Sequence, residues 1–268
     1  MDITLLTVNV AQFPPPLGIS NRLERAQNLA HCINYIDADI VVMQEMWSNY
    51  IREVFYDIVK VKYPYKCDDK SWGKFILGMH SGLFLISKYP INRSDIHHFE
   101  NYRGPEHFAK KGVLGAEIKV GDSSICVFTT HLQGGSGGAL FKWWDSNKPP
   151  TNIISGMEVA EIKLFVDDFS KGLPSLLAGD FNINANDNPP TEYQNCLNAL
   201  ICARDTYEGE SHLGSTWCDD STQSRQRIDY IFALDNKISG GSMIIPTISS
   251  SITDHLAVLG QYLSLIHI

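Results

Sequence analysis

Near its start the chain runs Ile3-Thr-Leu-Leu-Thr-Val8, an apolar stretch with the length and composition of a buried strand. Apolar residues then recur at helical spacing from Leu23 to Ile36, and Ile40-Val-Val-Met43 follows as a second apolar run of strand length. A strand, a helix and a second strand in this order are typical of layered folds that pack helices against sheets. The stretch from Ile3 to Met43 therefore predicts a fold with both helices and a β-sheet.

Strand signals dominate the rest of the chain. The spacing of apolar residues predicts a helix over 161–169, and a short apolar strand follows over 175–178. Strand signals lie on both sides of a Gly- and Pro-rich stretch near 134–150, so this stretch indicates a loop insertion in one domain. The further segments with strand composition, separated by turn-rich stretches, are 82–87, 113–120, 124–130, 228–232 and 256–263.

The bulk composition is that of an ordered globular protein, with 268 residues of which 44% are hydrophobic and 19% charged. A formal charge of -8 repels a polyanion over most of the surface and argues against extended nucleic-acid binding. The 6 cysteines lack both metal-ligand spacing and the density of a disulfide scaffold, which favours free thiols. Without a secretion-signal pattern or an apolar stretch of roughly 20 residues, we expect a cytoplasmic protein with peripheral membrane contact and no transmembrane segment.

Several apolar strands end in polar residues that can bind a metal ion or a phosphate. In layered folds the strand bodies are committed to the core, so the strand ends and the loops beyond them form the functional rim. Taken singly, Asn9 is also explained as a turn residue and Glu45 as a solvated carboxylate. The whole set consists of Asn9, Gln44, Glu45, His131, Asp180, Asn182, Asp254 and His255.

Asp229 has a different setting, because it lies within the apolar run Ile228-Asp-Tyr-Ile-Phe232. A carboxylate buried in such a strand costs free energy unless it is paired or hydrogen-bonded. We therefore expect a histidine as its partner.

The motifs around these residues follow one another in a characteristic order. They are Thr-Val-Asn9, Val-Met-Gln44-Glu45, Thr-Thr-His131-Leu-Gln, Ala-Gly-Asp180-Phe-Asn182, Arg227-Ile-Asp229-Tyr and Thr-Asp254-His255-Leu. In this order, and spanning nearly the whole chain, they resemble the endonuclease/exonuclease/phosphatase superfamily. The resemblance implies an α+β fold, a four-layer α/β/β/α sandwich of two stacked mixed β-sheets flanked by helices. It also implies a single catalytic domain over residues 1–268.

The resemblance further implies a metal-dependent phosphodiesterase in which a hard cation stabilises charge on a phosphoryl group. Glu45 is the first candidate ligand for Mg²⁺, with Mn²⁺ as the alternative ion, and Asn9 lies beside it. Asp180 and Asn182 hold the nucleophilic water, the phosphate or both.

Two histidines complete the catalytic set that the resemblance implies. Asp229 orients His255, since a carboxylate fixes the tautomer of an imidazole and supports its positive form. His255 is then the general base, and His131 stabilises the transition state or assists the leaving group. Some nuclease relatives suggest Asp180 as the base instead, and the sequence leaves both assignments open.

Within the superfamily, Ser81-Gly-Leu-Phe-Leu-Ile-Ser-Lys-Tyr-Pro-Ile91 and Phe108-Ala-Lys-Lys-Gly-Val-Leu114 are similar to the neutral sphingomyelinase pattern. This similarity implies hydrolysis of the phospholipid sphingomyelin to ceramide and phosphocholine at a membrane surface. In that family a lysine equivalent to Lys111 lies near the phosphate and pairs with an Asp in a switch loop near the site. The matching acidic position here is Glu106, so the pair survives with a longer arm or the switch is absent. The alternative for Lys111 is a solvated cation before a strand.

The insertion near 134–150 carries Phe141, Trp143 and Trp144. Exposed aromatic residues of this kind favour a lipid interface, so we expect them to contact the membrane. They fit equally well as side chains that pack over the sheet or line a substrate pocket.

Other function classes share parts of this pattern. An AP/DNA endonuclease has the same catalytic set but needs basic patches along a groove, which the acidic composition disfavours. The extended motifs of an inositol polyphosphate phosphatase are not evident. A catalytically inactive binding module is favoured only if catalytic positions are lost, and none is missing.

Overall fold

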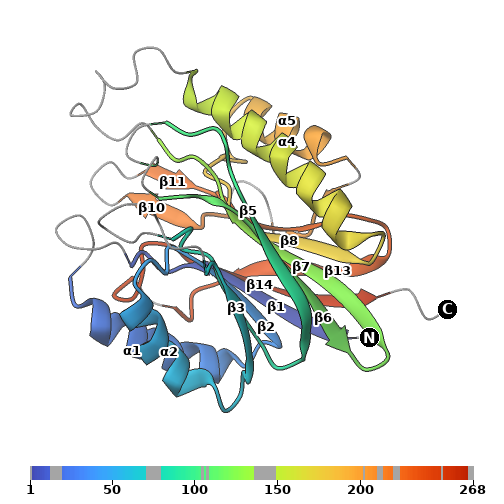
Figure 1. The fold of residues 1–268 in the computed structure, drawn as a ribbon. Coiled ribbons are helices and arrows are strands. Elements are labelled where there is room, and N and C mark those ends of the chain that lie inside the picture. Colours follow the sequence, from blue (N-terminus) through green and yellow to red (C-terminus); the bar gives the residue numbers. More distant parts are fainter. Residues whose placement is uncertain are drawn as a thin grey trace.

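The computed structural model describes residues 2–12, 20–70, 80–103, 106, 109–135, 149–201, 203–209, 214–219, 224–248 and 250–264. Within these ranges the chain forms two 6-stranded sheets and a small 2-stranded ribbon. The two large sheets lie face to face, with one pair of helices on each outer side (Figure 1).

The first sheet contains the strand pair predicted near the start of the chain. Its order is β13-β14-β1-β2-β4-β3, with β1 and β2 parallel and the other neighbours antiparallel. The strands are β1 (Asp2–Asn9), β2 (Ile40–Gln44), β3 (Tyr65–Asp68), β4 (Phe84–Ser87), β13 (Ile238–Ile245) and β14 (Ala257–Ser264).

The second sheet has the order β5-β6-β7-β8-β12-β9, in which only β7 and β8 are parallel. The strands are β5 (Ile91–His98), β6 (Gly112–Val120), β7 (Ser123–His131), β8 (Ser175–Asp180), β9 (Arg204–Asp205) and β12 (Asp229–Ala233). The separate ribbon pairs β10 (Trp217–Asp219) with β11 (Ser224–Gln226).

Apolar side chains fill the three interfaces between four layers. Helices α1 (Arg22–Ile36) and α2 (Asn49–Val59) pack on the outer face of the first sheet, where Leu29 and Phe55 share a cluster with Val41. Leu5 and Val127 belong to the cluster between the two sheets. Helices α4 (Thr151–Ser170) and α5 (Thr191–Ala199) cover the outer face of the second sheet. These interfaces confirm the expected four-layer sandwich of two mixed sheets flanked by helices.

The segments predicted as strands are strands in the structure, with boundaries that move by one or two residues. The predicted helix over 161–169 is present but begins ten residues earlier, at Thr151. The described cysteines are free thiols, as expected. No helix in the described part of the chain is long and apolar enough to cross a bilayer. Phe141, Trp143 and Trp144 lie outside the described residues.

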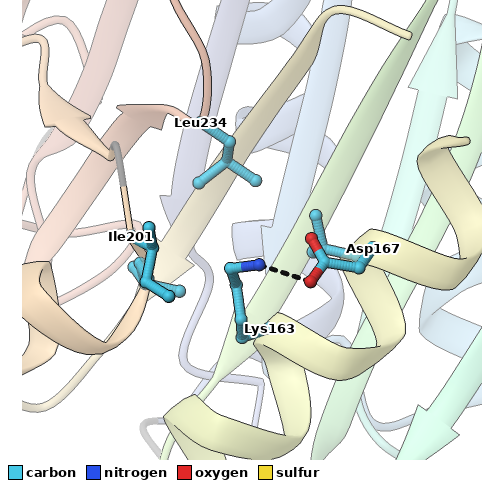
Figure 2. A pocket seen from close by; sticks show the side chains of 6 residues that line it. Lys163, Asp167, Ile201 and Leu234 are labelled. Atoms are coloured by element: carbon cyan, nitrogen blue, oxygen red, sulfur yellow. Dashed lines mark hydrogen bonds and ion pairs between the residues drawn. The ribbon is translucent and has the colours of Figure 1, made fainter. Parts of the chain in front are cut away.

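A small pocket lies on the outer side of the second sheet (Figure 2). It is lined by Lys163 and Asp167 of α4, which form an ion pair, and by Ile201 and Leu234 among others. Leu234 directly follows β12, whose first residue at the opposite end is Asp229. The pocket is therefore remote from the strand ends that carry the candidate catalytic residues.

Candidate active site

The strand registers bring the predicted polar residues to one edge of the sandwich. In the first sheet the parallel pairing of β1 and β2 places Asn9 beside Gln44, directly before Glu45. In the second sheet His131, at the end of β7, pairs with Asp180 at the end of β8. The antiparallel β12 begins there as well, with Asp229 opposite Asp180. Strand ends that are far apart in the sequence therefore converge.

Gly179 permits the close approach of the two strands that end in His131 and Asp180. Its φ of +148° is in the region that residues with a side chain rarely adopt, and a Cβ atom would lie 2.1 Å from the Thr130 carbonyl oxygen. Only glycine fits such a position. The motif Ala-Gly-Asp180 thus has a local structural reason for its glycine.

The two sheets meet at a hydrogen bond network centred on Asn9, which is fully buried. The Asn9 Nδ2 group donates to Glu45 Oε1 and to Asp180 Oδ2, each at 3.0 Å. The Asn9 Oδ1 atom accepts from the Ala11 backbone N–H at 3.0 Å. The network therefore holds two carboxylates, one from each sheet, on either side of a single amide group.

Both carboxylates are destabilised in their charged forms. Burial raises the pKa of Glu45, against the opposing effect of the Asn9 hydrogen bond and the charges of His255 and Lys111. Burial also raises the pKa of Asp180, and the neighbouring charge of Asp229 adds to this shift. A divalent cation relieves both costs, because it neutralises charge that the surrounding protein leaves unbalanced. The oxygen-rich donor set fits a hard cation such as Mg²⁺.

Asp229 has the histidine partner expected from its position in an apolar strand. Its Oδ2 atom lies 2.9 Å from His255 Nδ1, and both side chains are buried. The second ring nitrogen, Nε2, faces Asp180 Oδ2 at 3.9 Å. Burial opposes protonation of His255, but the charge and hydrogen bond of Asp229 outweigh it and raise the pKa of the imidazole. The pair thus presents one ring nitrogen to the site and fixes the other.

A second grouping of metal-binding atoms overlaps with this pair. One ligand atom from each of Asp180, Asp229 and His255 lies within 4.8 Å of the others. His255 Nδ1 is engaged with Asp229, however, and Mg²⁺ prefers oxygen ligands to imidazole. Asp180 is therefore the member of this group best suited to Mg²⁺, and the predicted ligand Glu45 lies outside the group.

Lys111 and His131 form the other side of the site. The Lys111 Nζ group lies 3.0 Å from His131 Nε2 and forms a 3.0 Å ion pair with Glu106 Oε1. The alternative of a solvated Lys111 is wrong, because the side chain is only 7% exposed. Burial, the charge of Lys111 and that of His255 hold the pKa of His131 well below its ordinary value. His131 is therefore neutral, with Nε2 accepting from Lys111 and the proton on Nδ1.

Asn182 and Glu45 share an unusual backbone conformation. Their φ angles are 51° and 62°, in the left-handed region that non-glycine residues rarely adopt. Asn182 Nδ2 donates to the Leu132 carbonyl at 3.1 Å, and its backbone N–H donates to Asp180 Oδ1 at 2.9 Å.

The comparisons with known proteins agree with the fold and with the arrangement of the site residues. A model of the Endonuclease/Exonuclease/phosphatase family matches residues 6–233, which is most of the chain. The chain belongs to this family. The match begins within β1 and ends with β12, so it includes every site residue described above except His255.

The relatives of the chain include proteins named sphingomyelinase C and phospholipase C. Sphingomyelinase C of Bacillus cereus is 26% identical over 250 residues, which cover 85% of this chain and 69% of the relative. The structure of sphingomyelinase C from Streptomyces griseocarneus superposes with a TM-score of 0.78 at 18% identity, covering 97% of this chain and 99% of that one. A beta toxin variant from Staphylococcus aureus with bound magnesium ions superposes with a TM-score of 0.76 at 19% identity, covering 97% and 99%.

One buried residue of this family member was not anticipated from its sequence. Thr216 Oγ1 accepts hydrogen bonds from the backbone N–H groups of Ile228 at 3.0 Å and Asp229 at 3.1 Å. The Thr216 carbonyl accepts from Leu256 N–H at 2.7 Å, directly after His255. Thr216 therefore fixes the backbone on both sides of the Asp229–His255 pair. Its role depends on contacts with distant segments, and no local pattern indicates it.

Replacement of Thr216 by valine is expected to lower the free energy of unfolding by about 1–3 kcal/mol, because two buried N–H groups lose their acceptor. Valine keeps the shape of threonine, so the packing is preserved. Thr216→Ser keeps the hydroxyl group and should recover most of the loss. Denaturant unfolding measures the difference, and equal stability of the valine variant and the wild type would contradict this account.

Proposed function

We propose that the chain is a Mg²⁺-dependent phosphodiesterase of the neutral sphingomyelinase type, which hydrolyses sphingomyelin to ceramide and phosphocholine. The observation that carries this proposal is the convergence, at one edge of the sandwich, of a carboxylate pair and an Asp–His pair beside a buried lysine. The members are Glu45, Asp180, Asp229, His255, Lys111, His131, Asn9 and Asn182. This set can bind a cation, a phosphoryl group and a water molecule at the same place.

The choice of a phospholipid substrate is supported by the relatives. Sphingomyelinase C of Bacillus cereus is among them, and the chain covers 69% of its length. The formal charge of -8 also favours a small phosphodiester over an extended nucleic acid. A sphingolipid substrate places the enzyme at a membrane surface, with peripheral contact to which Phe141, Trp143 and Trp144 of the insertion are proposed to contribute.

Glu45 and Asp180 are the residues proposed to bind the cation. Their oxygens flank Asn9 Nδ2 at 3.0 Å each, and Asn9 can join them if its amide turns to present Oδ1. When bound, Mg²⁺ supplies positive charge that stabilises the phosphoryl oxygens in the transition state. The residues around it bind the phosphate, orient water and move protons.

The Asp229–His255 pair is suited to proton transfer. In the reaction a water oxygen forms a bond to phosphorus while the bond from phosphorus to the ceramide oxygen breaks. The ceramide oxygen takes up one proton and leaves as an alcohol, and the base later returns the proton of the attacking water to solvent. The reacting form of His255 is the neutral imidazole, which a cation held near Asp180 would favour over the charged form that the metal-free site stabilises. Its Nε2 accepts the proton of that water, and Asp229 stabilises the resulting positive charge through its 2.9 Å contact with Nδ1. Asp180, 3.9 Å from Nε2, and Asn182 orient the water. Asp180 is the alternative base, since its own pKa is raised by burial.

Lys111 and His131 act on the phosphate and the leaving group. Neutral His131 keeps an N–H donor, and its Nδ1 atom has no hydrogen bond partner in the described part of the protein. Lys111 is anchored on Glu106 and the Leu132 carbonyl, so its charge is held in a fixed place. Fixed donors and charges stabilise a phosphoryl transition state without reorganisation.

A panel of three substrates tests the substrate class. We expect Mg²⁺-dependent release of phosphocholine from sphingomyelin vesicles, with little nicking of abasic DNA and little phosphate release from phosphoinositides. The reason is the absence of net positive charge that could hold a polyanion. A chelator control accompanies each substrate. Cleavage of abasic DNA alone, or of phosphoinositides alone, would overturn the sphingomyelinase assignment while leaving the phosphodiesterase in place.

A further inference from the structure

Beyond the end of β7 the chain has one sheet-like hydrogen bond, from Leu132 N–H to the Asp180 carbonyl at 3.0 Å, and side chains hold the residues that follow. We call residues His131 to Gly134 the His131 turn. Two carboxylates bind successive backbone N–H groups of this turn: Gln133 N–H donates to Glu158 Oε2 at 2.8 Å, and Gly134 N–H donates to Glu106 Oε1 at 2.9 Å. Glu106 is already tied to the site through Lys111, whereas Glu158 has no part in the reaction described above.

The carbonyl next to these amides links the His131 turn to the site. The Leu132 oxygen accepts from Lys111 Nζ at 2.7 Å and from Asn182 Nδ2 at 3.1 Å. The peptide unit between Leu132 and Gln133 thus has Glu158 on its N–H side and two phosphate-binding candidates on its C=O side. A shift of this peptide unit moves the acceptor of both Lys111 and Asn182.

Glu158 itself lies on the inward face of α4 and is only 1% exposed. None of the ion pairs in the described part of the chain includes it, because the nearby ammonium of Lys111 is paired with Glu106. Burial raises the pKa of Glu158 to about 8, against the opposing effects of the Gln133 hydrogen bond and the charge of Lys111. At neutral pH Glu158 is therefore mostly an uncharged carboxyl group.

We propose that Glu158 is a positioning residue that holds the His131 turn as an uncharged hydrogen bond acceptor, and so keeps Lys111 and Asn182 in place for the phosphate. The proposal rests on the proposed function in that the positioned groups act on a phosphodiester. Its structural part, the hold of Glu158 on the Gln133 amide, is independent of which substrate the enzyme cleaves.

The charge state of Glu158 matters because of the groups around it. Lys111 attracts its charged form, and Glu106 together with Glu161, one helical turn along α4, repels that form. Ionisation places an additional carboxylate charge near Lys111, whose charge Glu106 already balances. The extra attraction weakens the contact of Lys111 with His131 Nε2. We therefore expect turnover to fall as Glu158 ionises.

Substitutions separate the hydrogen bond from the charge. Glu158→Gln keeps an acceptor without a charge, and Glu158→Leu removes the acceptor. We expect kcat within about twofold of the wild type for glutamine at neutral pH and lowered by about tenfold or more for leucine, with KM little changed in both. Glu161→Gln is the matched control, because it neutralises a carboxylate that binds the 97–101 region instead of the His131 turn, and it should keep wild-type kcat.

The pH dependence of the protein's stability tests the charge state of Glu158. When the pKa of a carboxyl group is higher in the folded protein than in the unfolded one, the folded state binds more protons at any pH between the two pKa values. The free energy of unfolding therefore falls as pH rises through this range. The melting temperature of Glu158→Gln should therefore rise relative to wild type between about pH 5 and about pH 8. Above that range the gain should stay constant.

Amide hydrogen exchange tests the contact between Glu158 and the Gln133 amide, and it needs no substrate. The protection factor of the Gln133 amide should be unchanged in Glu158→Gln and should fall by about tenfold or more in Glu158→Leu. Wild-type kcat and protection in the leucine variant, or equal damage by glutamine and leucine, would overturn the proposal. If leucine prevents folding, a melting temperature of Glu158→Gln that tracks the wild type at every pH would overturn it. A wild-type protein inactive on every diester refutes the proposed function instead, and the exchange and melting data still decide the role of Glu158.

Discussion

Replacement of His255 by alanine is expected to lower kcat by about a thousandfold or more, while the protein remains folded. His255 is the group whose Nε2 atom faces the carboxylate of Asp180 at 3.9 Å and whose Nδ1 atom is fixed by Asp229 at 2.9 Å. Without the imidazole, the water proton has no acceptor of this kind. The effect should fall on kcat with little change in KM, because the ring is proposed to act on the reacting water.

The same substitution leaves a buried carboxylate without its partner, so a loss of stability has to be separated from a loss of chemistry. Asp229 is 2% exposed and its Oδ1 atom already lacks a hydrogen bond within the described structure. His255→Gln offers a donor toward Asp229 and should recover stability but no turnover. His97→Ala is the matched control, because it breaks another histidine–carboxylate contact, 2.7 Å to Glu161, outside the site. Near-normal turnover in folded His255→Ala would remove His255 from catalysis.

Replacement of Glu45 by glutamine is expected to lower Mg²⁺-dependent turnover by about a hundredfold or more, because the first candidate ligand loses its charge. The stability of the metal-free protein should change in the opposite direction. Burial raises the pKa of Glu45 in the folded state, so its charge destabilises the fold increasingly as pH rises above the ordinary value of 4.5. The neutral glutamine removes that cost.

Melting temperatures with and without Mg²⁺ check both parts of this prediction. The wild type should gain stability when Mg²⁺ is added, by mass action on the folded state. The Glu45→Gln variant should melt higher than the wild type without metal and gain little from Mg²⁺. Glu117→Gln, at a carboxylate paired with Arg93 at 2.7 Å outside the site, should respond to Mg²⁺ as the wild type does. An unchanged Mg²⁺ response in Glu45→Gln would exclude Glu45 as a ligand.

Elements with a clear apolar period could be predicted from the sequence, and those without one could not. The strand–helix–strand unit from β1 to β2 follows from its periodicity alone. In α4 only the second half was predicted, because Ser155 and Gly156 interrupt the apolar pattern of the first half. Strand β13 was missed because Gly240 and Gly241 weaken the strand signal. Helix α2 is an exception: Ile51, Phe55 and Val59 lie at helical spacing, although the helix is not among the predicted segments.

In the candidate site, too, some residues could be predicted from the sequence and others could not. Residues at strand ends, such as Asn9 and Asp180, could be assigned to a common rim because the strands themselves were predictable. The partner of Asp229 could be anticipated from the cost of burying a carboxylate, and His255 occupies that place at 2.9 Å. Thr216 and Glu158 could not be anticipated, since each acts on backbone groups that only the folded chain brings near.

Hydrolysis of sphingomyelin vesicles in heavy-oxygen water tests the central claim most directly. If the buried cluster is a Mg²⁺-dependent phosphodiesterase that directs water to phosphorus, phosphocholine released in the presence of Mg²⁺ carries the heavy oxygen and ceramide does not. Release should stop with a chelator and resume when Mg²⁺ is restored. Absence of release under all conditions, release that persists in the chelator, or label in ceramide would contradict the account.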